Sequence, residues 1–289
     1  QYSDALVDAL ADRSFVLSSR GDLAGARRDI ENARKLVRNV PDDMARCRIE
    51  LYAGWLDYQE RKAQAALACY DYAEPLLRAA GNLPLLIECL NSRGIVLRAL
   101  HRLEESLACA KEAEDMLRQF RSTKALAVQI GNIGVIYRIM ERLDEALECF
   151  QQAEAGLREV GDRLGLTRTL SHIADLYLFL DEVDLARKIA LEGLEYSNRQ
   201  GDKIGMARLN ALLGHAAYAQ SDFGEALRRF ETTVTIHTDM KHDLEAAGTR
   251  AFAMLCHDFP HWHLRIVGPS AEADGGGGER YLASIREAA

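Results

Sequence analysis

Small residues recur every forty residues along most of the chain, and this sets the pattern of buried and exposed positions. With Gly134 as the reference, steps of forty residues in both directions reach Ser14, Gly54, Gly94, Ala174 and Gly214. Twelve residues further on, the same steps reach a second small set, Ala26, Ala66, Ser106, Ala146, Ala186 and Ala226. Self-similarity at this period predicts a solenoid, in which each unit buries its apolar face by stacking on its neighbours.

Each unit is predicted to form two amphipathic helices joined by a short turn. In the fourth unit, "NIGVIYRIM" (132–140) and "DEALECFQQAEAGLREV" (144–160) carry apolar residues at helical spacing on either side of a turn. Polar residues ahead of the helical runs predict N-caps at Asp42, Asn82, Ser122, Asp162 and Asp202. The pattern predicts one array over residues 1–260, with units starting near 7, 47, 87, 127, 167 and 207 and a partial seventh at 247.

The order Gly134, Tyr137, Ala146, Phe150, Ala153 resembles the signature of the tetratricopeptide repeat (TPR) family. The forty-residue length and the "GDRLG" and "GDKIG" junctions are similar to the longer variant found in Pins-type adaptors and bacterial signalling proteins. The resemblance covers about residues 7–246. It implies an all-α, right-handed superhelical solenoid and a role in binding other proteins, but it does not identify the partner.

In this family, four positions of each first helix, spaced three, four and three residues apart, point into a concave groove. In this sequence those positions include Arg48, Trp55, Tyr58, Asn91, Arg98, Arg138, Arg168, Ser171, Asp175, Arg208, His215 and Tyr218. Five arginines on one face predict a groove that binds an acidic peptide segment, with the aromatic residues as apolar anchors. The alternative is an ordinary solvated face whose arginines pair with neighbouring acids.

Arg98 and Arg138 occupy the same position in adjacent units. If a second helix separates successive first helices, these arginines lie about two helix-packing distances apart, roughly 16 to 20 Å. An extended ligand would then carry acids about five or six residues apart. A chaperone-type carboxylate clamp is not supported, because its positions hold Ala11, Phe15, Leu51 and Trp55.

Composition narrows the class of partner and the compartment. The net charge of −8 argues against non-specific nucleic-acid binding, and no apolar run approaches the length of a membrane span. The chain opens on Gln1, so we expect no signal peptide and a piece of a longer protein. The cysteines form no CxxC pair, and Cys69, Cys109 and Cys149 follow the repeat, which favours buried packing thiols and a reducing, cytoplasmic location.

No set of residues predicts catalysis, so we expect a non-enzyme without cofactor or metal. "CHDFPHWH" (256–263) holds metal-binding residue types, but its spacing matches no strong zinc pattern. Residues 261–289 are predicted to be an irregular tail with a glycine-rich linker and a short helix that is either frayed or folded back on the array. The sequence thus favours an interaction module, or alternatively a ligand-responsive regulatory domain of a larger bacterial signalling protein, such as a transcription activator or cyclase.

Overall fold

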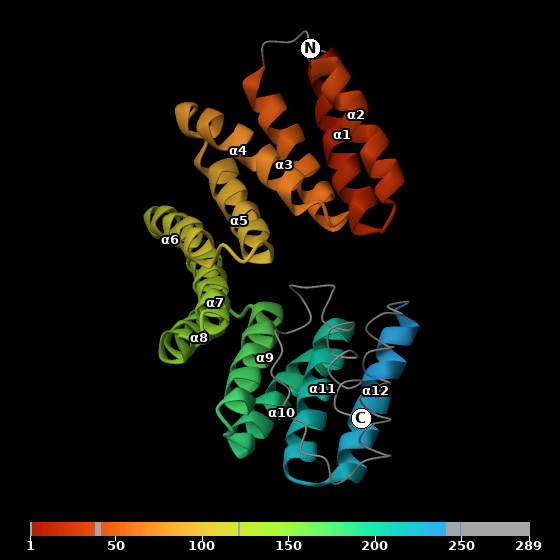
Figure 1. The fold of residues 1–289 in the computed structure, drawn as a ribbon, viewed down its shortest axis with the longest axis vertical. Helices are drawn as coiled ribbons and strands as arrows, with labels where there is room; N and C mark the ends of the chain where they lie inside the picture. The colour runs from red at the N-terminus through yellow and green to blue at the C-terminus, as the bar shows by residue number, and fades with distance from the viewer. Residues whose placement is uncertain (1, 38–41, 121, 241–248, 250–289) are drawn as a thin grey trace. The chain divides into compact units, whose positions relative to one another are not determined.

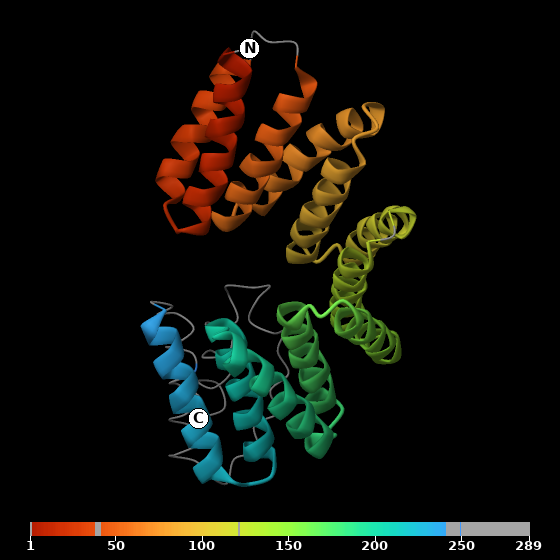
Figure 2. The ribbon, with the colours of Figure 1, turned by 180° about the vertical axis from the view of Figure 1, so that it is seen from behind.

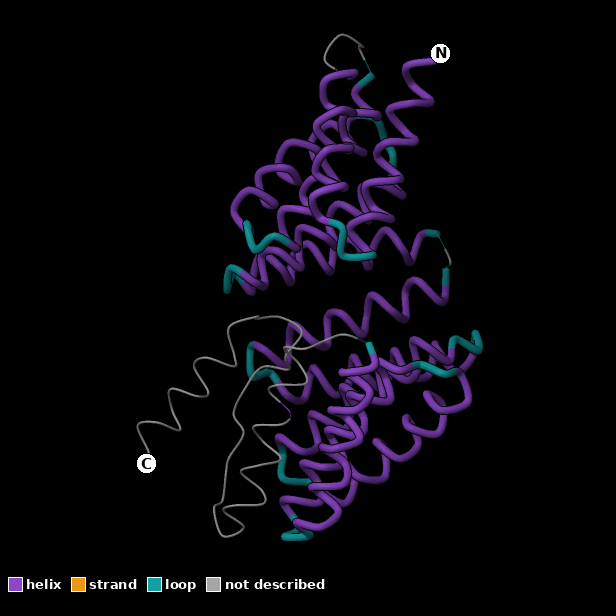
Figure 3. Tube along the Cα trace, turned by 90° about the vertical axis from the view of Figure 1, so that its right-hand side faces the viewer, coloured by secondary structure: helices purple, strands orange, loops and turns teal. Residues whose placement is uncertain are grey.

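The computed structural model describes residues 2–37, 42–120, 122–240 and Thr249, and this part of the chain is all-α (Figure 1). Figure 3 shows helices joined by short loops throughout these ranges, with no strand among them. The helices are α1 (Tyr2–Ser19), α2 (Leu23–Val37), α3 (Asp43–Gln59), α4 (Ala63–Ala79), α5 (Leu83–Ala99), α6 (Leu103–Gln119), α7 (Thr123–Ile139), α8 (Leu143–Glu159), α9 (Arg163–Phe179), α10 (Val183–Gln200), α11 (Lys203–Ala219) and α12 (Phe223–Asp239). The six predicted helix pairs are confirmed, whereas the partial seventh unit and the tail lie outside the described residues.

The chain divides into two compact units, Gln1–Arg121 with α1 to α6 and Ser122–Ala289 with α7 to α12. Within each unit, every first helix packs against its own second helix and directly against the next first helix, as α9 does with α10 and α11 (Figure 2). The second helices make no comparable contact with one another in the described ranges. We call the side of the first helices that is turned away from the second helices the inner face of that unit.

Small residues allow the two helices of a pair to approach closely. A Cβ added to Gly134 would lie 2.7 Å from a ring carbon of Phe150, and one added to Gly214 would lie equally close to Phe230. Both rings are fully buried. Because carbon atoms in contact normally stand about 3.5 to 4 Å apart, these glycines are required by the rings that they face. The small-residue register predicted from the sequence is therefore confirmed.

Side-chain caps define the start of most first helices. Asp42, Asn82, Asp162 and Asp202 each accept a backbone hydrogen bond from the first turn of the helix that follows, as predicted. Ser122 stands at the N-cap position of α7 but makes no such bond. No described helix is long and apolar enough to cross a membrane.

Candidate ligand-binding face

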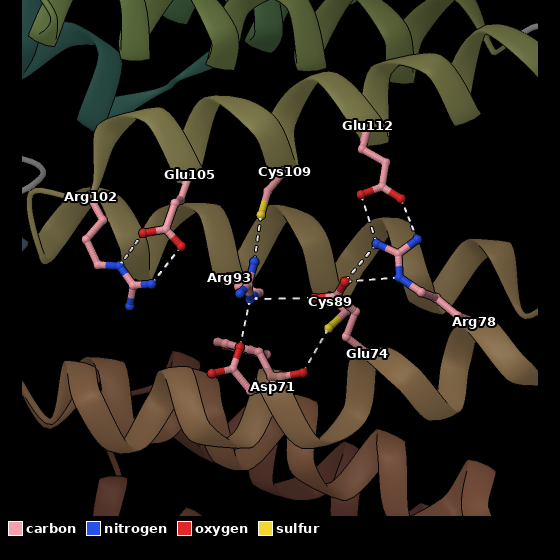
Figure 4. Close-up of polar contacts among 10 residues, drawn as sticks. Asp71, Glu74, Arg78, Cys89, Arg93, Arg102, Glu105, Cys109 and Glu112 are labelled. Carbon is pink, nitrogen blue, oxygen red and sulfur yellow. Dashed lines mark hydrogen bonds and ion pairs between the residues drawn. The ribbon is translucent and has the colours of Figure 1, made fainter.

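Arginines on the second helices are held by carboxylates. On α8, Arg158 contacts Glu154 of its own helix at 2.9 Å and Glu192 of α10 at 2.5 Å. On α4, Arg78 is bound in the same way by Glu74 and by Glu112 of α6 (Figure 4). These pairs staple successive second helices, and because they are partly exposed each stabilises the fold only modestly.

Arg93 of α5 occupies a more buried site between α4 and α6 (Figure 4). Its guanidinium lies 2.9 Å from Asp71 and 3.5 Å from Glu74, and it donates a hydrogen bond of 3.1 Å to the sulfur of Cys109. Burial raises the pKa of the Cys109 thiol despite the adjacent positive charge, so this thiol is protonated and inert at neutral pH.

The other described cysteines also have packing roles. Cys47, Cys69 and Cys89 are buried, and Cys149 is half-buried. None of these thiols forms a disulfide in the described part of the chain, so the expectation of buried packing cysteines is confirmed for most of them. Cys256 lies outside the described residues, as does the rest of "CHDFPHWH". In the described ranges, no group of three or more His, Cys, Asp or Glu side chains could hold a metal ion.

The inner face of the first unit carries ion pairs and aromatic rings. Arg48 of α3 contacts Asp8 of α1 at 2.6 Å, and it acts electrostatically on the carboxylate of Glu88 on α5. The Trp55 and Tyr58 rings lie against each other, with centroids 5.7 Å apart. On this face, the first of the predicted groove arginines is therefore already engaged by acids.

Two further rings extend this aromatic surface. Phe15 of α1 and Tyr52 of α3 lie 5.5 Å apart between centroids, and the Tyr52 hydroxyl donates a hydrogen bond to Asp12. Asn91 and Arg98, the other predicted groove residues of this unit, are half-buried on α5. On this face of the first unit, the pairing of charges that the alternative interpretation expects is present for Arg48.

The inner face of the second unit has a different composition: Asp175 lies near Arg138 and Arg208, and Arg168 lies near Arg208. Arg138 of α7 contacts Asp175 of α9 at 3.2 Å, and its side chain is only 9% exposed. Burial raises the pKa of Asp175, although the charges of Arg138 and Arg208 lower it. Burial also lowers the pKa of Arg208, and repulsion from Arg168 lowers it further. Arginine remains charged despite such a shift, so two guanidinium groups of like charge, those of Arg168 and Arg208, adjoin each other on this face.

Charges at the N-terminal ends of α9 and α11 complete this face. Asp162 and Asp202 act electrostatically on Arg168 and Arg208 respectively. Each of these aspartates also accepts a backbone hydrogen bond as a helix cap, and Asp162 contacts Lys124 at 3.1 Å. Two of the three acids near the arginines are therefore engaged in capping.

The remaining predicted residues of the second unit have packing contacts. His215 lies edge-on to the buried Phe230 ring at 5.1 Å, and burial lowers its pKa to about 4. Tyr218 packs on Phe223 at 5.5 Å, while the buried Ser171 hydroxyl donates to the carbonyl of Arg168. These three side chains make packing contacts or a local hydrogen bond, and they add no charge to the face at neutral pH.

One premise of the expected ligand spacing is wrong. Successive first helices are in direct contact within each unit, so no second helix intervenes between them. Arg98 belongs to the first unit and Arg138 to the second, so the comparison is made for Arg168 and Arg208. Their helices are separated by one packing distance, about 8 to 10 Å, so acids five or six residues apart in an extended ligand would be too far apart to reach both.

Comparisons with known proteins agree with this architecture. Residues 125–199 match the family model described as tetratricopeptide repeat. A search among curated proteins finds no match.

Solved structures share the fold at low sequence identity. A Rap protein complexed with the competence and sporulation factor is 13% identical, with a TM-score of 0.64 over 88% of this chain and 76% of that one. Aspartyl phosphate phosphatase F from Bacillus subtilis is 14% identical, with a TM-score of 0.63 over 89% and 72% of the two chains. A signal transduction ATPase from Pyrococcus horikoshii with a tetratricopeptide repeat sensor is 14% identical, with a TM-score of 0.64 over 88% of this chain and 42% of that one.

Proposed function

We propose that the chain is a non-catalytic interaction module of the tetratricopeptide repeat type, which binds an acidic peptide segment on the inner face of its second unit. The observation that carries the proposal is the group Arg138, Arg168 and Arg208 on this face, in which Arg168 lies near Arg208 and Asp175 contacts Arg138. Guanidinium groups bind carboxylates through forked, charge-assisted hydrogen bonds, so an acidic segment is the complementary ligand.

The electrostatics of the site support an incoming acid. Arg168 and Arg208 repel each other, and the carboxylate of Asp175 acts on both Arg138 and Arg208. An acidic side chain of the ligand that enters between Arg168 and Arg208 would contact both and so relieve that repulsion. The proposed site is therefore smaller than the groove predicted from the sequence. Five of the predicted groove residues lie in the first unit and are not part of the site, namely Arg48, Trp55, Tyr58, Asn91 and Arg98.

The same chemistry suggests the partner and the compartment. Peptide or protein partners are proposed rather than nucleic acid or membrane, because the chain as a whole is acidic with a net charge of −8. The protonated packing thiol of Cys109 suits a reducing, cytoplasmic location. A signalling role as part of a longer protein is the second candidate, suggested by the ATPase in which the similar repeats are described as a sensor.

Selection of a displayed library of randomised linear peptides on the purified chain tests the proposal. We expect enrichment of peptides with Asp or Glu residues, and weaker binding of a labelled selected peptide as salt rises. Arg168→Glu with Arg208→Glu should abolish binding and keep the helical circular dichroism spectrum.

The matched control reverses two arginines of the second helices, Arg158→Glu with Arg199→Glu. Both are partly exposed, and Arg158 is bound by Glu154 and by Glu192 of α10, while Arg199 is bound by Glu195 of its own helix. The control should retain binding. Selected peptides without acidic residues, or equal losses in both double variants, would show that the inner face of the second unit is not the site.

A further inference from the structure

Two aliphatic side chains stand exposed at the start of α9 and α11. Leu164 is 59% exposed and Ile204 is 56% exposed, the highest values for large apolar side chains in the part of the chain that the structure describes. They occupy the same position in consecutive repeats, forty residues apart. Single exposed apolar residues are common, but a repeated pair on neighbouring helices forms a patch.

The patch is continuous with the basic site. Leu164 precedes Arg168 by four residues, and Ile204 precedes Arg208 by four residues, so each pair lies on one side of its helix. Since α9 packs directly on α11, the four side chains form two adjacent rows, one apolar and one basic. We call these four residues the apolar-basic patch.

The first unit fills the corresponding position differently. Met44 of α3 is half-buried and packs against the core of the first unit, where its sulfur accepts a hydrogen bond from Asn82 at 3.7 Å. In α3, folding therefore uses the apolar residue at this position, whereas α5 has the exposed Pro84 there. In the second unit, Leu164 and Ile204 leave more than half of their surface in water, where they contribute little to the core.

We infer that the segment bound by the second unit carries an aliphatic side chain two residues from an acid, so that the aliphatic side chain covers Leu164 and Ile204 while the acid contacts Arg168 and Arg208. This inference rests on the proposed function. Four helical residues span about 6 Å along the axis, and two residues of an extended chain span nearly the same length. Residues two apart also point to the same side of an extended segment. The partner is therefore acidic and aliphatic in alternation, rather than uniformly acidic.

The experiment uses the whole chain and two synthetic peptides. The first carries one Asp with a Leu two residues away, and the second has Ser in place of that Leu. Leu164→Ser with Ile204→Ser should lower the affinity for the first peptide roughly tenfold, because the peptide then no longer buries two half-exposed aliphatic side chains. The second peptide should bind this variant and the wild type equally, with an unchanged salt dependence.

The matched control is Leu185→Ser with Leu191→Ser on α10, where the two leucines are 43% and 41% exposed. It should leave the affinity for both peptides unchanged. Equal affinity of the wild type for the two peptides would overturn the inference. A change of oligomeric state in the patch variant, measured by sedimentation without any effect on the first peptide, would also overturn it, since a second copy of the chain would then be the occupant.

Failure of the proposed function gives a different result. In that case Arg168→Glu with Arg208→Glu would leave the binding of both peptides intact. Failure of the inference alone would leave acid-dependent binding in which the two peptides have the same affinity.

Discussion

The two units share one helical template, yet their inner faces have different chemistry. One row of equivalent positions reads Asp8, Arg48, Glu88 in the first unit and Val128, Arg168, Arg208 in the second. A further row, seven residues on, reads Phe15, Trp55, Ile95 in the first unit and Val135, Asp175, His215 in the second. Charges alternate along the first unit, whereas arginines adjoin one another along the second. Helix packing therefore tolerates different residue types at these positions. We expect the two units to differ in ligand affinity and in the dependence of their stability on charge and pH.

The largest expected effect separates the two faces by neutral substitution. Arg168→Gln with Arg208→Gln should weaken a selected acidic peptide by about a hundredfold, since each charge-assisted hydrogen bond contributes roughly 1.5 to 3 kcal/mol. Arg48→Gln with Arg98→Gln should change the affinity less than about threefold, because Arg48 is bound by Asp8. Fluorescence polarisation on the wild type and both double variants measures these effects. Equal losses of affinity in the two double variants would favour the single groove predicted from the sequence over a site confined to the second unit.

The second prediction concerns pH and His215. Burial lowers its folded-state pKa to about 4, so the native state keeps His215 neutral while the unfolded chain takes up a proton below about pH 6.5. The free energy of unfolding should therefore fall by up to about 3 kcal/mol as pH drops from 6.5 to 4. Urea titrations of His215→Gln should show less of this loss, whereas His101→Gln, at an exposed turn position, should match the wild type. An identical pH slope in all three proteins would contradict the assignment.

A third prediction uses the glycines at the helix contacts. Gly134→Ala would place a Cβ 2.7 Å from Phe150 and should lower the free energy of unfolding by about 1 to 3 kcal/mol. Gly94→Ala in the first unit meets no atom closer than 3.6 Å, because Ala110 occupies the position of Phe150. That substitution should be neutral or stabilise by up to about 1 kcal/mol through helix propensity. Denaturant titration that ranks the two in the opposite order would show that ring contacts do not set the packing.

These cases show which features can be predicted from sequence. The period, the helix pairs and the capping aspartates follow from local residue types, so the fold was predicted well. Small residues mark close contacts, but whether Gly134 is indispensable depends on Phe150, sixteen residues away. The pairing of the charged residues was harder to predict. The spacing of the groove positions predicted which residues share a face, but their ion pairs depend on side chains from neighbouring helices. Arg48 of α3 forms an ion pair with Asp8 of the neighbouring first helix, whereas Arg208 of α11 lies near a second arginine, Arg168 of α9.

The smallest effect is expected from Asp175, which the second unit has in place of the aromatic and aliphatic residues of the first. Its carboxylate lies 3.2 Å from Arg138 and competes with an incoming acid for the same guanidinium groups. Asp175→Asn should therefore raise the affinity for the acidic peptide about two- to fivefold at low salt, and less at high salt.

The pH dependence of that effect identifies its cause. Burial raises the folded-state pKa of Asp175 above its unfolded value, so ionisation of Asp175 costs folding free energy as pH rises through the raised pKa, and protonation removes that cost at lower pH. Protonated Asp175 no longer competes for Arg138 or Arg208. The ratio of the Asn variant's affinity to the wild type's should thus shrink toward one as pH falls through the raised pKa. Titration of the peptide's own acids cancels in this ratio, because both proteins meet the same ligand. A ratio that stays constant with pH, or an Asn variant that binds more weakly, would mean that Asp175 positions Arg138 for the ligand instead of competing with it.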